Sequence, residues 1–242
     1  MKYVYAVCEE SELIQHKAFI SQQGKKLHAF LEFLHNTYHV QDLPGTIVLT
    51  SEEIATRMIC DIPVPAYTND YRTVFCPDIS TWEKIYLRQL QDLDSPVIRR
   101  YYETGLTENH ILQILGHEFV HHSELFFDEA YEQARWFEEG MCEYISRKYF
   151  LTDTEFDEEA RINAALVARY EKRFGKQALE EFTADTYSCS YEDIFFFYWK
   201  SFLTVNSIIE QQSGDLMSVF RSYRNWFDSS SPLRLTEWFH IA

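Results

Sequence analysis

The 242-residue chain has few of the residues that interrupt regular structure, with only 7 glycines and 6 prolines. Because glycine and proline favour turns and break helices, this scarcity predicts long helices. Large side chains are abundant instead, and aromatic residues make up 17% of the sequence. A chain of this size can bury a substantial core, although its length does not decide between one domain and two.

The sequence also lacks a regular arrangement of cysteines. The five cysteines are odd in number and scattered, and no two form a C-x-x-C pair: Cys8, Cys60, Cys76, Cys142 and Cys189. This pattern argues against a disulfide framework and against a zinc site built from cysteines. Residues 1–10 contain too short an apolar run for a signal peptide, and no segment approaches the roughly 18–20 apolar residues of a membrane helix. We therefore expect a reduced, cytoplasmic protein.

Positive charge is scarce as well. The chain has 22 Lys and Arg against 38 Asp and Glu, which gives a formal net charge of −16 at pH 7. An anionic protein of this kind repels nucleic acid and anionic membrane surfaces, so we predict neither as a partner. The acidic excess helps to keep an aromatic-rich protein soluble. The oligomeric state stays open at this point.

One short segment has the spacing of a metal site. Residues 117–121 read His-Glu-Phe-Val-His inside an apolar stretch that predicts a helix. Four residues advance a helix by about 400°, so His117 and His121 lie one turn apart on one face. Two imidazoles so placed can bind one Zn²⁺, and Glu118 is positioned to act on a metal-bound water. The alternative is a helix with ordinary histidines, because a motif this short also arises by chance.

A second segment offers carboxylates for a third ligand. Residues 136–144 read Trp-Phe-Glu-Glu-Gly-Met-Cys-Glu-Tyr and predict a helix that runs back beside the first. A catalytic zinc needs three protein ligands and one open position. Neighbouring helical residues point about 100° apart, so only one of Glu138 and Glu139 can face the metal, and the other is expected to be a solvated surface charge. Glu143 is placed to accept a hydrogen bond from a ligating histidine, unless it is an exposed glutamate.

The two segments together resemble the gluzincin metallopeptidases, whose H-E-x-x-H helix is completed by a glutamate ligand. The matching residues are His117, Glu118, His121, Trp136, Glu139, Gly140 and Tyr144. The resemblance covers about residues 107–149 and extends weakly to about 215, and residues 1–100 carry no matching motif. It implies that Glu139, which precedes the glycine, is the ligand rather than Glu138.

The donor that stabilises an oxyanion stays open between three residues. The resemblance favours Tyr198, because related enzymes place a tyrosine just before the helix that residues 199–202 resemble. Tyr144 is expected to pack between the two site helices. His122 points about 100° from His121, so we expect it to support the site or lie at the surface rather than bind the metal. The run 195–199 is apolar on all sides and predicts a buried helix.

The pattern of the whole chain predicts an α+β, zincin-like fold. Strands are predicted at residues 3–7, 46–49 and 71–76, with helices at 11–22, 25–39, 50–58, 80–93 and 96–104. Further helices are predicted from Thr107 to about 125, and at 129–150, 155–174, 191–212 and 215–227. Strand 71–76 is a candidate sheet edge for binding extended peptide, and the alternative is a core strand. We predict an N-terminal α/β lobe, residues 1–105, and a helical zinc-binding lobe, residues 106–242, within one compact unit.

These patterns predict a zinc-dependent metallopeptidase that acts on a peptide or protein substrate. Zn²⁺ is held by His117, His121 and Glu139, and Glu118 is the general base that later protonates the leaving amine. The main alternative is a non-catalytic zincin-like domain that binds a peptide or protein. Glu118 argues against it, because a binding module has no use for a general base. A helical structural protein with an accidental motif is a third possibility. Cleavage specificity is not encoded in any motif that we recognise.

Overall fold

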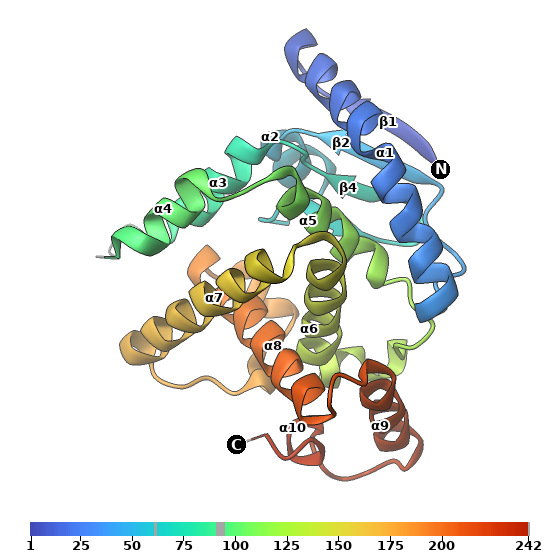
Figure 1. Ribbon diagram of the computed structural model, residues 1–242, viewed down its shortest axis with the longest axis vertical. Helices are drawn as coiled ribbons and strands as arrows, with labels where there is room; N and C mark the ends of the chain where they lie inside the picture. The colour runs from blue at the N-terminus through green and yellow to red at the C-terminus, as the bar shows by residue number, and fades with distance from the viewer. Residues whose placement is uncertain (61, 91–94, 242) are drawn as a thin grey trace. The chain divides into compact units, whose positions relative to one another are not determined.

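The computed structural model describes residues 1–60, 62–90 and 95–241, and its fold is α+β, as predicted. A four-stranded mixed sheet in the N-terminal part is followed by a mostly helical C-terminal part (Figure 1). The chain divides into two compact units. The first comprises Met1–Ser123 and Ser146–Thr152, and the second comprises Glu124–Ile145 and Asp153–Ala242. This split groups the H-E-x-x-H helix with the sheet; the two predicted lobes, 1–105 and 106–242, stay a prediction.

The sheet of the first unit has the strand order β1-β2-β4-β3. Its strands are β1 (Lys2–Ala6), β2 (Thr46–Thr50), β4 (Thr73–Phe75) and β3 (Ala66–Thr68). The first three strands run parallel, and β3 pairs antiparallel with β4. All three residues of strand β4, Thr73, Val74 and Phe75, are buried. Of the two possibilities for residues 71–76, a sheet edge or a core strand, the structure supports the core strand. Among the described residues, β3 is the outer strand on that side.

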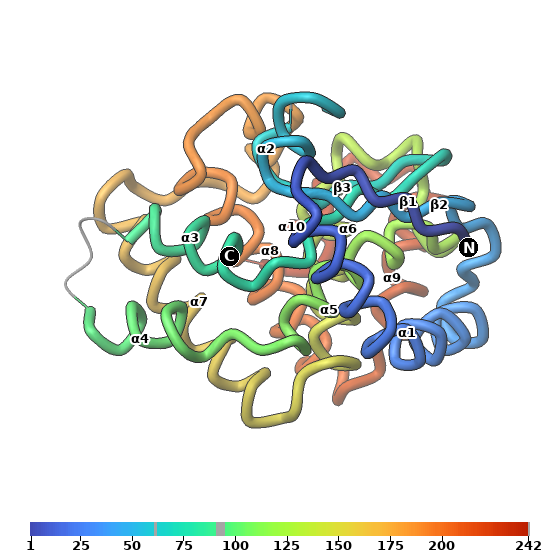
Figure 2. The backbone as a smooth tube through the Cα atoms, turned by 90° about the horizontal axis from the view of Figure 1, so that it is seen from above, coloured from blue at the N-terminus to red at the C-terminus, as the bar shows by residue number. Residues whose placement is uncertain are grey.

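Helices cover both faces of this sheet. On one face, Val48 and Val74 pack with Ala55. Ala55 begins the single π-helical turn Ala55–Ile59, which continues the short helix α2 (Glu52–Ile54). On the other face, the ring of Phe75 lies 6.0 Å from that of Phe19 in α1 (Glu10–Tyr38). Helix α5 (Glu108–Val120) lies beside α1 and β3 on this same face (Figure 2).

Helix α1 is continuous, which corrects the prediction of separate helices at 11–22 and 25–39. Gly24 lies inside it, with no atom within 4 Å of the place where a side chain would begin. A single helical glycine costs only about 1 kcal/mol. Burial of Leu27, Phe30 and Leu34 outweighs that cost. The next helices are α3 (Ile79–Arg88) and α4 (Pro96–Thr104). The predicted end of the first of these near residue 93 lies outside the described residues.

The second unit is helical. Its long helices, all four of which were predicted, are α6 (Tyr131–Phe150), α7 (Asp153–Phe174), α8 (Tyr191–Gln211) and α9 (Leu216–Asp228), and a short α10 (Leu235–Trp238) follows. The last part of α6, from Ser146 onward, belongs to the first unit. Helices α7 and α8 lie side by side (Figure 1), with the rings of Tyr170 and Phe196 stacked at 4.0 Å. The run 195–199 is buried as predicted, except for the half-buried Tyr198. Among the described residues, no helix is both long and apolar enough to cross a membrane.

Candidate metal centre

Helix α5 begins and packs as its sequence requires. Thr107 caps it, as predicted: its hydroxyl accepts a hydrogen bond from the backbone N–H of Asn109 at 3.3 Å. A side chain at Gly116 would begin 2.7 Å from the ring of Phe150 and 2.9 Å from that of Phe30. Glycine therefore lets the helix approach these rings closely, directly before the first histidine of the motif.

The two histidines of the motif lie together at the end of α5. Their Nε2 atoms are 3.1 Å apart, and the ring centroids are 4.9 Å apart. A tetrahedral zinc that binds two imidazoles at about 2.0–2.1 Å separates their nitrogens by about 3.3 Å. The positions of His117 and His121 therefore fit a shared divalent cation with little movement.

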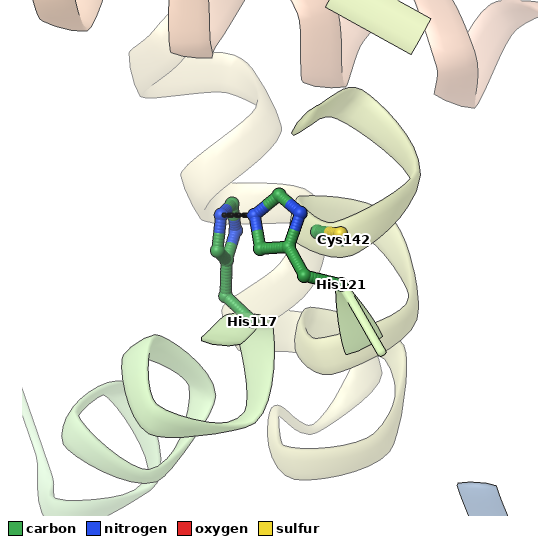
Figure 3. Close-up of side chains that lie close together, drawn as sticks. All are labelled: His117, His121 and Cys142. Carbon is green, nitrogen blue, oxygen red and sulfur yellow. Dashed lines mark hydrogen bonds between the residues drawn. The ribbon is translucent and has the colours of Figure 1, made fainter. Parts of the chain in front are cut away.

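A third potential ligand completes this group, and it is a cysteine. One ligand atom each from His117, His121 and Cys142 lie within 4.8 Å of one another, so the three residues could hold a metal ion (Figure 3). His117 and Cys142 are buried and His121 is half-buried. Imidazole and thiolate donors both suit Zn²⁺. The argument from cysteine spacing does not apply to Cys142, because spacing along the chain does not report ligands from separate helices.

Helix α6 supplies Cys142 and the predicted ligand Glu139. These residues are three positions apart, so they lie on one face of the helix. Glu139 is only 2% exposed, and its Oε1 accepts hydrogen bonds from the hydroxyls of Tyr131 at 3.2 Å and Tyr187 at 3.3 Å. The close group of ligand atoms contains Cys142 and not Glu139. The assignment of Glu139 as a ligand stays a prediction.

Two local features shape α6. Ala134 has non-helical angles (φ −122°, ψ 17°), so the first turn is kinked relative to the rest. At Gly140, a side chain would begin 2.6 Å from the backbone oxygen of Ser201 in α8. Only glycine allows the backbones of α6 and α8 to approach this closely. The glycine of the predicted W-x-x-E-G pattern therefore has a packing role next to Glu139.

The neighbouring carboxylates of α6 are buried as well. Glu138 is 8% exposed and Glu143 is 9% exposed. The expectation that Glu138 is a solvated surface charge is therefore wrong, because α6 is enclosed on more than one side. Burial raises the pKa of Tyr223 in α9, and the charge of Glu138 adds to that shift. The role of Glu143 as an acceptor for a ligating histidine stays a prediction.

The three candidate oxyanion donors have different surroundings. The Tyr198 hydroxyl lies 2.8 Å from that of Tyr187. The ring of Tyr144 stands edge-on to that of Phe156, with the ring centroids 5.8 Å apart. Burial raises the pKa of Tyr144. His122 shares a 2.8 Å hydrogen bond with Thr68 of β3.

Burial lowers the pKa of His122 to about 4, and the charge of His121 contributes to this shift. His122 is therefore neutral at pH 7. It lies outside the group of ligand atoms, and its supporting role stays a prediction. The proposed general base Glu118 is buried in α5, at 7% exposure.

The chain matches no protein-family model, no curated protein and no solved structure.

Proposed function

We propose that this chain is a zinc-dependent metallopeptidase. The observation that carries the proposal is the 3.1 Å approach of the His117 and His121 Nε2 atoms at the end of α5. A buried glutamate, Glu118, directly follows the first of these histidines. This combination is typical of zinc peptidases with the H-E-x-x-H motif and supports the proposal.

Each residue has a separate task in the proposed reaction. His117, His121 and Glu139 hold the ion. When bound, the ion lowers the pKa of a coordinated water towards about 7 and polarises the substrate carbonyl. Glu118 accepts the proton of the attacking water and delivers it to the leaving amine. Tyr198 donates a hydrogen bond to the oxyanion, where the negative charge develops.

The substrate would lie along β3. This strand is the outer strand next to β4, it runs antiparallel to β4, and it lies beside α5. Thr68 joins it to His122, the residue that follows the motif. An extended peptide can add main-chain hydrogen bonds to a strand in such a position. The role first considered for residues 71–76 is thus transferred to β3.

The identity of the third ligand can be tested directly, because Glu139 and Cys142 share a face of α6. We assign Glu139, since two phenols orient its carboxylate. On this assignment, Glu139→Ala abolishes tight Zn²⁺ binding and Cys142→Ala retains it. In the Co²⁺-substituted protein, a sulfur-to-cobalt charge-transfer band that disappears in Cys142→Ala would instead identify the thiolate as the ligand.

The proposed activity is tested by Glu118→Gln. We expect about one zinc per chain in both wild type and variant, and a fall in peptide hydrolysis of roughly 10²–10⁴-fold in the variant. The matched control is Glu108→Gln, an exposed glutamate at the start of the same helix, and its activity should stay at the wild-type level. Full activity in Glu118→Gln contradicts the mechanism. A zinc protein that binds peptides from a mixed library but cleaves none is instead the non-catalytic zincin-like domain.

A further inference from the structure

A set of hydrogen bonds within the second unit converges on one oxygen of Glu139. The hydroxyls of Tyr131 and Tyr187 both donate to Oε1, at 3.2 Å and 3.3 Å. Behind Tyr131, Nη1 of Arg135 donates to the phenol oxygen at 2.9 Å. Behind Tyr187, the hydroxyl of Tyr198 lies at 2.8 Å. The sequence motif includes Glu139, but nothing in it indicates Tyr131, Arg135 or Tyr187.

The number of available protons fixes the direction of these bonds. An ionised carboxylate only accepts hydrogen bonds, and each phenol has a single proton to donate. Because Tyr187 donates its proton to Glu139, the 2.8 Å bond must be donated by Tyr198 to Tyr187. A guanidinium has no acceptor, so Arg135 donates to Tyr131. Both branches therefore donate towards Glu139.

A buried positive charge stabilises this arrangement. Arg135 is 5% exposed, and its Cζ lies 4.3 Å from the centroid of the Tyr131 ring. Burial lowers the pKa of this guanidinium, but the nearby tyrosines Tyr131 and Tyr187 and the acids Glu132 and Glu139 outweigh burial and raise it overall. Arg135 thus stays charged, with the acids Glu132 and Glu139 among the groups that keep it so.

The two phenols reach Glu139 from separate places. Tyr131 precedes it by eight residues, which is about 12 Å along a straight helix. The kink at Ala134 lies between them and changes the direction of the first turn. Tyr187 lies on the 3₁₀ turn Ala184–Ser188, whose start is fixed by a hydrogen bond from the Thr183 N–H to the Thr186 hydroxyl.

We propose that Tyr187 is a positioning residue of the metal centre, which acts with Tyr131 to orient the Glu139 carboxylate and also holds the hydroxyl of Tyr198. This inference rests on the proposed function. In the resting site the proton of Tyr198 is directed to Tyr187. When Tyr198 turns that proton to an oxyanion, Tyr187 keeps its own bond to Glu139. Tyr187 thus links the proposed ligand Glu139 to the proposed oxyanion donor Tyr198.

The test compares Tyr187→Phe with Tyr170→Phe. Tyr170 is a matched control, because its phenol also donates to a carboxylate of the second unit, Asp193. We expect Tyr187→Phe to weaken Zn²⁺ binding by roughly 10–100-fold in a chelator competition, as is typical of lost outer-shell partners. The visible d–d spectrum of the Co²⁺ form should shift, and thermal unfolding of both metal-free variants checks that each is folded. Tyr198→Phe should lose turnover but keep its Zn²⁺ affinity.

Equal Zn²⁺ affinity and identical Co²⁺ spectra in wild type, Tyr187→Phe and Tyr170→Phe would overturn this inference and leave the proposed function intact. Failure of the wild-type protein to bind Zn²⁺ would instead overturn the proposed function. Should Tyr187→Phe not fold, Tyr131→Phe removes the other phenol from the same oxygen and is expected to weaken Zn²⁺ binding in the same way. Unchanged binding in Tyr131→Phe then overturns the inference.

Discussion

Helices α5 and α6 both carry predicted site residues, but they orient them by different means. On α5 the helix alone places His117 and His121 one turn apart. On α6 the carboxylate of Glu139 is oriented by Tyr131, across a kink, and by Tyr187, 48 residues further along the chain. A local motif thus specifies the first arrangement completely, whereas the second depends on the tertiary fold.

The glycines next to these residues differ in the same way. Gly116 of α5 packs against the rings of Phe150 and Phe30, which are side chains that can shift. Gly140 of α6 packs against the backbone of Ser201, which can move only if α8 moves. An added methyl group at Gly116 should therefore be easier to accommodate than one at Gly140.

The largest effect should come from His121, a proposed ligand at the end of α5. His121→Ala is expected to weaken Zn²⁺ binding by more than about 100-fold, beyond the range typical of a lost outer-shell partner. The control is His28→Ala, because His28 lies on α1 with its side chain 76% exposed. Zn²⁺ affinities from chelator competition measure both. A His121→Ala protein with wild-type affinity would show that α5 does not contribute the pair of ligands that we infer.

The glycine comparison makes a prediction about stability. Overpacking costs about 1–3 kcal/mol, and alanine regains about 1 kcal/mol of helix preference. We expect Gly140→Ala to lower the free energy of unfolding by about 2 kcal/mol and Gly116→Ala by less than about 1 kcal/mol, as measured by urea unfolding. Gly24→Ala, at an open position of α1, is the control and should be neutral or stabilising. A larger loss for Gly116→Ala than for Gly140→Ala would reverse the comparison.

The starts of the two helices differ as well. Thr107 caps α5, whereas the 3₁₀ turn that leads into α6, Asp128–Ala130, has no side-chain cap at Phe127. Thr107→Ala should lower the free energy of unfolding by about 1 kcal/mol. Thr104→Ala, at an exposed position near the end of α4, should change it little. Thermal unfolding of both variants tests this, and equal midpoints would indicate that the cap contributes nothing measurable.

The smallest expected effect concerns Asp78, which lies outside α5 and α6 at the start of α3. Burial raises the pKa of Asp78, but hydrogen bonds from Ser80 and Thr81 outweigh burial and lower it overall. The charged form therefore stabilises the fold above the pKa of an unfolded aspartate, about 3.9, and this contribution is lost as the pH falls through the folded pKa. Asp78→Asn should lower stability slightly at pH 7 and have a smaller effect near pH 2. Urea unfolding at both values measures the difference, and an equal effect at both would contradict it.

The periodic features of the chain were predictable from its sequence. Apolar spacing identified the four long helices after residue 125, and the H-E-x-x-H spacing identified the histidine pair. Features that depend on contacts between residues far apart in the sequence were not predicted. Helical periodicity shows that Glu139 and Cys142 share a face, but not which ligand atom lies near the histidines. Nothing local distinguishes Tyr187 from the other tyrosines, because its role comes from a turn far along the chain from α6.

The burial of Glu138 was missed, and the position of β4 was left open between edge and core, for a related reason. A glutamate is expected to be solvated unless the surrounding elements enclose it, and α6 is enclosed. A β-branched and aromatic strand has the same composition at the centre of a sheet as at its edge, and only the pairing with β3 decides between the two.

The brevity of β3 has a consequence for selectivity. Its three residues, Ala66–Thr68, span about 10 Å of extended chain. A peptide laid along this strand would share main-chain bonds over only about that length, and alternate side chains would point towards the protein. Recognition would then depend on one or two amino-acid positions on either side of the cut. An enzyme built this way reads a very short stretch of sequence, so access to an unfolded segment would select its targets more than a long consensus would.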